Sequence, residues 1–545
     1  MPENKPHNQF RNLVNILCVL FLFAVGIKWG WNLQAHNDFL FGDEAEYMRN
    51  GVDFFSVLRN DWGPSYNLWY KLLSLFTTDP VQLYFLNYVL GAVLAGILIY
   101  IALERYRFHQ LVAMYLSFCF LLSEININTW PRVSHFIVIV LLLGLIAATY
   151  VESRAKKVLV FCSSGFIAAY SRPDLLLPFF IMLLFAIFFI YKERTQLKKL
   201  FPFILVLAGI ILFFQGIFGL PASNYRGDID RLYIAFGQHF TINYKARTHA
   251  DMDPITDWLF FCQNFFPGAK TVGDIIRTHF TDVVQNSIFN LKNYLRIILE
   301  TTGSFICPVK ILHFKKLAYL FLAGLLGSVI YIFINPAKRK LLADFIKERW
   351  LTLLWLFVFS ITSIGMCILI FPRQHYIMLH SIFIIFILAC LLNVLLRNFA
   401  IKLIYLLPLF ILLLIFSPTA GKYNYLQVTQ DMKNLCSQKL FRYLYTKTDR
   451  PYAIFSSVLN ISYPLPKNFT EFNTEYELKE GMQFTDVLKE KRINIIFVTN
   501  NLLANPLLKN DAGWQHFLNN PQEYHFNRVN YSDACSSYLL MKENP

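Results

Sequence analysis

Three carboxylates lie close together in the first polar stretch of the chain. They are Asp43, Glu44 and Glu46, directly followed by Tyr47, and they come soon after an apolar segment at 13–31. Carboxylates beside a bilayer are costly unless they have a partner or a task. An ionised carboxylate can take a proton from a reacting group that lies within hydrogen-bond reach. The acidic cluster is therefore a candidate for general-base chemistry.

The same residues also allow a purely structural interpretation. If a helix starts here, Asp43 could be its N-cap and Glu46 could close a capping box. Asp43, Glu46 and Tyr47 would then share one helix face, because they are three and four residues apart. The two interpretations are compatible, since a capping carboxylate is held rigidly and still faces solvent.

Cationic and imidazole side chains mark the ends of several apolar segments. Guanidinium groups suit phosphate oxygens because they present a planar fork of donors. The alternative for any one arginine is pairing with lipid headgroups at the interface, or pairing with a neighbour, as Arg172 could with Asp174. The candidates of this kind are Arg132, His135, Arg172, Arg373 and His375.

The composition indicates what must position these residues. The chain has 545 residues, of which 56% are hydrophobic and 16% charged, and its mean hydropathy is +0.43. Soluble domains are less apolar and more charged. We expect a mainly α, polytopic membrane protein with about 11 transmembrane helices. The predicted spans are 12–31, 82–103, 110–123, 134–151, 158–170, 174–191, 200–220, 317–334, 350–371, 377–396 and 403–418.

The net charge of +15 comes largely from short loops between these spans, and one of them is the basic segment 338–349. Short basic loops stay in the cytoplasm, so the charge reports topology rather than nucleic-acid binding. The pattern predicts a multi-pass plasma (inner) membrane protein with a cytoplasmic N-terminus. All the candidate residues then lie on the extracytoplasmic face. Partners are expected among membrane lipids, and no nucleic acid is expected.

Three longer segments are predicted outside the membrane. External loops cover about 32–81 and 221–316, and the second should contain amphipathic helices on the membrane surface. The transmembrane domain thus covers 1–418. Residues 419–545 form a tail in which short apolar runs at 452–457 and 493–499 flank a helical stretch at 484–491, which predicts a small soluble α/β domain. Cys436 and Cys535 could form a disulfide there. No Cys or His spacing typical of a metal site occurs, and no cofactor is expected.

Taken together, the order of these motifs resembles that of the GT-C superfamily of integral-membrane glycosyltransferases. The nearest patterns are those of protein O-mannosyltransferases and bacterial lipid A aminoarabinose transferases. The resemblance covers roughly residues 10–400. Its motifs are the Asp43-Glu44 pair with Tyr47, the stretch Gly63-Pro64-Ser65-Tyr66, the triplet Arg172-Pro173-Asp174, and Pro372-Arg373 shortly before Tyr376.

The resemblance implies a glycosyltransferase that uses a polyprenyl-phosphate-linked sugar. We expect it to invert the anomeric carbon, because no covalent nucleophile is evident. The acceptor would be a glycan, lipid or protein of the cell envelope. By carry-over, Asp43 is the catalytic base and Glu44 supports it. The expected substrate-binding residues are Tyr47, Arg49, Arg132, His135, Arg172, Arg373 and His375.

Two positions depart from the family pattern. Glu46 stands where some relatives carry a phosphate-binding arginine, and Arg49 follows one turn later. The acid that many relatives have at the start of the fourth span is missing, and Glu124 is the nearest substitute. Two alternatives therefore stay open: a membrane transporter, or a catalytically degenerate accessory protein of glycan assembly.

Overall fold

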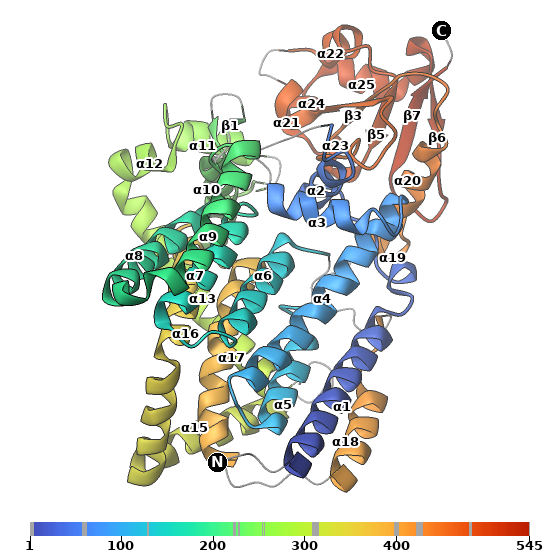
Figure 1. The fold of residues 1–545 in the computed structure, drawn as a ribbon. Coiled ribbons are helices and arrows are strands. Elements are labelled where there is room, and N and C mark those ends of the chain that lie inside the picture. The colour runs from blue at the N-terminus through green and yellow to red at the C-terminus, as the bar shows by residue number, and fades with distance from the viewer. Residues whose placement is uncertain are drawn as a thin grey trace.

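The computed structural model describes residues 5–56, 63–127, 130–221, 225–226, 229–252, 254, 257–307, 315–396, 403–420, 429–478 and 482–543. The chain is mainly helical, with a small sheet near its C-terminal end. Figure 1 shows a tall helical bundle with the C-terminal unit at the top, above α2 (Asp43–Val52) and α3 (Pro64–Leu73). These two short helices lie between the bundle and the sheet.

A helix covers most of each segment that was predicted to span the membrane. The helices are α1 (Lys5–Gly30), α4 (Pro80–Arg105), α5 (Gln110–Leu121), α6 (Val133–Ala148), α7 (Arg154–Ala169), α8 (Leu176–Lys192), α9 (Leu197–Phe218), α15 (Lys315–Ile334), α16 (Pro336–Leu369), α17 (Gln374–Leu396) and α18 (Leu403–Phe416). By length and composition, six segments within the described residues can cross a membrane, and they include α1, α4, α8, α9, α16 and α17. The larger count of about eleven crossings stays a prediction.

The helix α5 illustrates why the two counts differ. Its 12 residues rise only about 18 Å, well short of the roughly 30 Å hydrocarbon core. Nearly all its side chains from Val112 to Leu121 are buried, against α4, α1, α13 (Phe280–Ile306) and α17. It is a central helix of the bundle that meets little or no lipid.

One prediction about the bundle is wrong. The basic segment 338–349 was expected to be a cytoplasmic loop, but α16 runs through it without a break. Asn335 caps this helix through its side chain, and Pro336 occupies the first helical position. The residues that follow, such as Ala337, Lys340 and Leu341, favour helix, so charge alone did not mark a break.

The second external segment folds into helices, as predicted. They are α10 (Arg231–Thr248), α11 (Trp258–Phe265), α12 (Val272–Thr278) and α13, the last being the most amphipathic of the long helices. A cluster of buried asparagines fixes them to the bundle. Asn243 donates to Asn286 and Asn290, and Asn290 donates to the carbonyls of Ile368 and Ile370 at the end of α16.

The C-terminal unit contains a five-stranded sheet with the order β4-β3-β5-β7-β6. The strands are β3 (Tyr452–Ser456), β4 (Phe469–Asn473), β5 (Ile495–Val498), β6 (Phe526–Val529) and β7 (Tyr538–Lys542). The strands β3 and β5 are parallel neighbours and α22 (Phe484–Glu490) lies between them in the chain, as the sequence pattern predicts, but the connection also contains β4, which was not predicted. The remaining helices are α19 (Gln430–Lys433), α20 (Cys436–Tyr445), α21 (Thr474–Glu477), α23 (Asn500–Leu503), α24 (Pro506–Lys509) and α25 (Ala512–Asn519).

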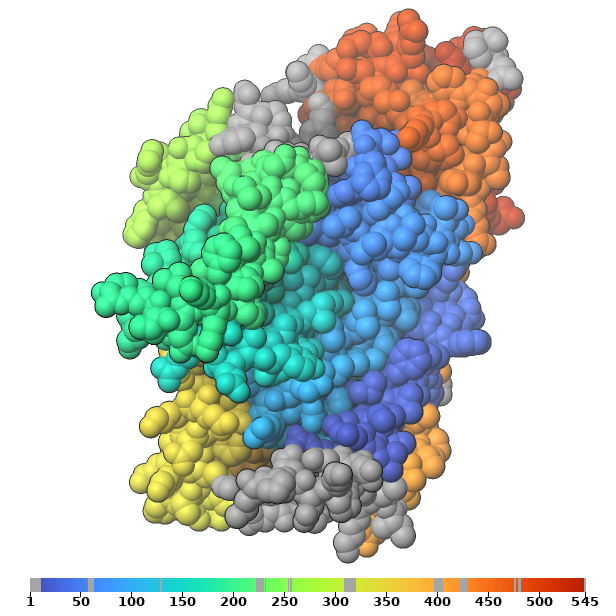
Figure 2. Space-filling view, viewed as in Figure 1, coloured from blue at the N-terminus to red at the C-terminus, as the bar shows by residue number. Residues whose placement is uncertain are grey.

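Two features tie this unit to the rest of the chain. Cys436 and Cys535 form the predicted disulfide, which links the start of α20 to the loop before β7. The carboxylate of Asp38, in the first external segment, accepts from the backbone N–H groups of Ser437 and Gln438 at 2.9 and 3.0 Å. An anion at a helix N-terminus is favourable because unpaired N–H groups point toward it. Figure 2 shows the resulting close packing of the C-terminal unit (orange to red) against the early segment (blue).

Candidate functional site

A hollow of about 590 Å³ opens between the top of the bundle, α10 and the C-terminal unit. It collects residues from seven separate parts of the chain. Its lining includes Asp43, Glu44, Tyr47, Arg132, Arg172, Arg373 and His375, so seven of the nine candidate residues meet in one place. The other lining residues are Leu40, Phe41, Trp130, Pro131, Val133, Ile234, Ala235, Gln238, Tyr376, Met432 and Leu459.

Asp43 is the exposed acid of this hollow. The capping-box interpretation is wrong, because Gly42 is the N-cap of α2, with φ of 108°, and Asp43 is the first helical residue. Glycine suits that position since a φ in this region strains other residues. The face presented to the hollow carries Asp43, Glu44 and Tyr47, whereas Glu46 is buried and does not line it.

Glu44 occupies the opposite environment. It is only 6% exposed, and one of its carboxylate oxygens accepts from the hydroxyls of Tyr66 and Tyr70 and from the amide of Asn87, the last at 3.1 Å. Burial raises the pKa of Glu44 to about 7, although the two tyrosine hydrogen bonds act to lower it. Glu44 is therefore held in place and is partly protonated near neutral pH.

Arg132 precedes α6 and lies over the ring of Trp130, at 4.0 Å from the ring centroid. Burial lowers the pKa of this guanidinium to about 10, and the nearby charge of Arg373 adds to the effect, while Asp43 and Glu44 oppose it. Arg132 thus stays protonated at neutral pH. Its Nε atom is buried and has no hydrogen-bond partner among the described residues, so a donor remains for water or a ligand.

Arg172 is fixed more firmly. It forms two hydrogen bonds to Asp174, at 3.0 and 2.7 Å, and lies over the ring of Tyr376 at 4.6 Å. Arg172 thus pairs with Asp174, which was the structural alternative to phosphate binding, and it also lines the hollow. Its Nη1 atom finds no hydrogen-bond partner within the described part of the chain.

Arg373 has a partner that the sequence did not reveal. Its guanidinium contacts Nε2 of His239, on α10, and that imidazole stacks on Phe371 at 4.6 Å. Burial lowers the pKa of His239 to about 3, and the charge of Arg373 lowers it further, so the neutral ring accepts a hydrogen bond from the arginine. No motif marks His239, because it is 134 residues away from Arg373 in the chain.

The two remaining candidates lie elsewhere. Arg49 points to the C-terminal unit, where it donates to the carbonyl of Ser462 at 3.3 Å and lies near Asp53. His135 is buried, and its Nε2 atom is 2.7 Å from the carbonyl of Asn126, so it braces the turn before α6. Neither residue lines the hollow, and Glu124 does not line it either.

The arrangement brings three guanidinium groups together with one exposed and one buried carboxylate. Such a surface can hold a phosphate and can accept a proton beside it. Within the described residues, no group of three or more His, Cys, Asp or Glu side chains could hold a metal ion. No protein-family model matches the chain, and no curated protein matches it.

Proposed function

We propose that the protein is a membrane glycosyltransferase that moves a sugar from a polyprenyl-phosphate donor to an acceptor on the extracytoplasmic face. The observation that carries the proposal is the meeting of Asp43, Arg132, Arg172 and Arg373 in one hollow at the end of the bundle. These residues are up to 330 positions apart in the chain. The transferase interpretation requires these four residues to meet in one pocket. Separate structural roles for each charged residue would not require it.

The geometry supports a division of roles. Asp43 is exposed in the hollow, so it acts as the base that takes the acceptor proton. Glu44 is saturated on one oxygen by two tyrosines and an asparagine, so it positions the start of α2 and adds charge only when it is ionised. The three arginines stabilise the phosphate that leaves as the sugar is transferred.

The rival functions remain weaker. A transporter places its substrate near the bilayer midplane, between broken helices. Here the hollow lies where α6 and α17 begin and where α7 and α16 end, not halfway along them. A degenerate accessory protein would explain the missing second acid, but it gives no reason for three arginines to surround an exposed aspartate.

Asp43→Asn tests the base directly. Purified protein is incubated with a panel of polyprenyl-phosphate sugars and a membrane extract of the host, and the released polyprenyl phosphate is measured by mass spectrometry. We expect the rate to fall by about 10²- to 10⁴-fold, because this is what a general base contributes. The matched control is Asp533→Asn, an exposed aspartate of the C-terminal unit. Full activity of Asp43→Asn would remove the assignment.

A pair of arginine variants tests the donor site. Arg373→Ala should raise the KM for the lipid-phosphate donor by roughly ten- to a hundredfold, since a hydrogen bond to a charged group is lost. The KM for the acceptor should change much less. Arg49→Ala is the control, because Arg49 is an arginine of α2 that contacts the C-terminal unit and does not line the hollow. Equal effects of the two variants on the donor would contradict the proposed role of Arg373.

A further inference from the structure

We propose that a second hollow, at the opposite end of the bundle, binds a phosphate-bearing anion at the depth of the lipid headgroups. This hollow measures about 360 Å³ and is formed by the end of α4, the turn between α6 and α7, and the middle of α16. It shares no residue with the hollow around Asp43, and the inference does not depend on the proposed transferase activity.

The charge of its lining is strongly one-sided. Six cationic side chains line it, and they are Arg105, Arg107, Arg154, Lys157, Lys347 and Arg349. Two carboxylates, Glu152 and Glu348, line it as well, and Glu348 is paired with Arg349 at 2.8 Å. The cations therefore outnumber the acids threefold.

The depth of the hollow follows from α16. Within α16, Arg349 lines the second hollow. The helix ends at Leu369, four residues before Arg373, which lines the first hollow. Twenty residues of α-helix rise about 30 Å, which is the thickness of the hydrocarbon core of a bilayer. The two hollows thus lie at opposite boundaries of the membrane, and the basic one is at headgroup level on the side predicted to be cytoplasmic.

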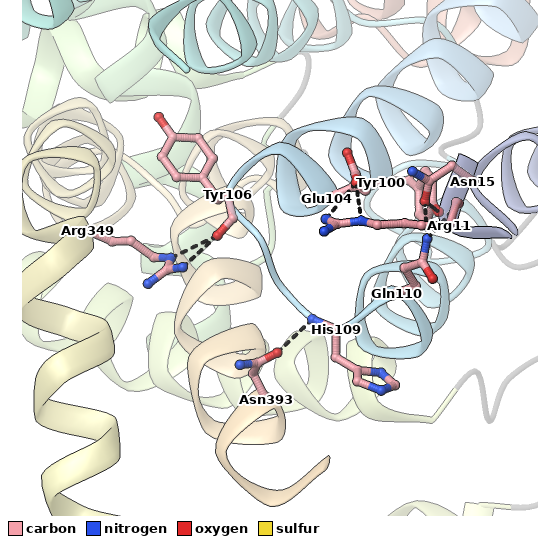
Figure 3. Close-up of polar contacts among 9 residues, drawn as sticks. All are labelled: Arg11, Asn15, Tyr100, Glu104, Tyr106, His109, Gln110, Arg349 and Asn393. Carbon is pink, nitrogen blue, oxygen red and sulfur yellow. Dashed lines mark hydrogen bonds and ion pairs between the residues drawn. The ribbon is translucent and has the colours of Figure 1, made fainter. Parts of the chain in front are cut away.

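The floor of this hollow is built rigidly. Arg349 is 5% exposed, and its guanidinium donates twice to the carbonyl of Tyr106, at 2.7 and 3.1 Å. The N–H of His109 donates to Asn393 at 2.6 Å, so the turn between α4 and α5 is fastened to α16 and α17 (Figure 3).

Arg107 ends α4 in the left-handed region, with φ of 59°. Its N–H donates to the carbonyl of Glu104 at 2.8 Å, and the N–H of Phe108 donates to that of Leu103 at 3.1 Å, which is a common way for a helix to end. Arg107 directly follows Tyr106, whose carbonyl is held by Arg349. The floor of the hollow is therefore fixed by hydrogen bonds before a ligand binds.

The chemistry of the lining selects the ligand. Arginine forks bind phosphate oxygens in pairs, and basic pockets beside the membrane bind acidic headgroups. The volume suits a phosphate or diphosphate group and not a whole lipid. Two sources can supply that group, an anionic phospholipid or a soluble phosphate compound, and the experiment separates them.

The test uses the full-length protein in a zwitterionic detergent. One arm measures retention of phosphatidylglycerol, with phosphatidylcholine for comparison, by native mass spectrometry. The other arm measures binding of inorganic pyrophosphate by calorimetry without lipid. The variant is Arg154→Gln/Lys157→Gln. Its control is Arg194→Gln/Lys198→Gln, which removes the same charges from the next basic turn, outside the hollow, where Arg194 likewise lies over an aromatic ring.

Binding of either probe should weaken roughly thirtyfold in the variant and stay unchanged in the control, because each of the two basic residues near the surface contributes about fivefold. Binding of phosphatidylglycerol alone identifies a lipid, and binding of pyrophosphate identifies a soluble ligand. Failure of both probes to bind the wild-type protein, or equal losses in both variants, would overturn the proposal. If the variant does not fold, Arg105→Gln/Lys347→Gln, at two exposed positions, replaces it.

Discussion

Asp43 and Glu44 are neighbours in the chain, yet they meet opposite surroundings. Asp43 faces the hollow, while Glu44 is enclosed by Tyr66, Tyr70 and Asn87. The amide of Asn87 also contacts both tyrosine hydroxyls, at 2.7 and 2.8 Å, so the cluster is joined throughout. Two carboxylates with different environments can carry different protonation states at one pH, which is how acid and base roles are separated.

This environment makes stability depend on pH. The pKa of Glu44 in the folded protein, about 7, is above its ordinary value of 4.5, so the folded state holds the proton more tightly than the unfolded state. The contribution is present below pH 4.5 and is lost as the pH rises through 7. The loss amounts to at most about 3 kcal/mol. Thermal unfolding of the wild type should show this decline, and Glu44→Gln should flatten it.

The control for this prediction is Glu300→Gln, at an exposed position of α13. It should keep the wild-type slope. The same slope in Glu44→Gln and in the wild type would mean that another group titrates, and the assignment of the raised pKa to Glu44 would fail.

The sequence predicted the residues that line the hollow better than their partners. Asp43, Arg132, Arg172 and Arg373 could be chosen because charges at the ends of apolar segments are conspicuous. His239 could not, because it lies in a mixed amphipathic segment and acts only through a contact made in the folded chain. His135 was mistaken for a binding residue, since the sequence does not tell a buried structural imidazole from an exposed one.

At the scale of elements, apolar runs located the helices but not all their ends. The prediction placed a loop at 338–349, where α16 is continuous. Charge pattern reports the side of the membrane, whereas helix ends depend on caps such as Asn335. Conversely, β3, α22 and β5 were readable because β3 and β5 are short, mostly apolar runs within a polar segment. β4 was missed, because its sequence includes Thr470, Glu471 and Asn473.

The disulfide sets the stability of the C-terminal unit. Cys436 and Cys535 are 99 residues apart, so the bond removes much freedom from the unfolded chain. The double variant Cys436→Ser/Cys535→Ser should destabilise the unit by about 4–5 kcal/mol in the chain-entropy account. Hydrogen exchange of β5 and α25 peptides in the full-length protein should speed up accordingly, while peptides from α4 should not change.

Treatment of the wild type with a reductant is the matched comparison. Among the described residues, Cys436–Cys535 is the one disulfide and the other cysteines are free thiols, so the reductant acts on one bond. Exchange in β5 and α25 that is equally slow with and without the bond would show that packing against α2 and Asp38 suffices to hold the unit.

At the scale of the whole molecule, the two hollows face opposite ends of the same helices. The upper one mixes acids with arginines, and the lower one is dominated by cations. The C-terminal unit closes one side of the upper hollow through Met432 and Leu459. Under the proposed transferase function, an acceptor that enters there would touch both the unit and the bundle.

The side of the membrane on which Asp43 lies determines which class of sugar donor can reach it. Lys198 and Lys509 are both exposed. The turn before Lys198 lies beside the second hollow, because the hydroxyl of Ser153 donates to Glu193, whereas Lys509 belongs to the C-terminal unit beside the first hollow. The free cysteines within the described chain are buried. In intact cells, an impermeant maleimide should therefore label Lys509→Cys but not Lys198→Cys, and Lys198→Cys should react once the membrane is permeabilised. The reverse pattern would place Asp43 in the cytoplasm. There, nucleotide-activated sugars are available, so the arginines would have no need of a lipid-linked phosphate and the proposed donor would be wrong.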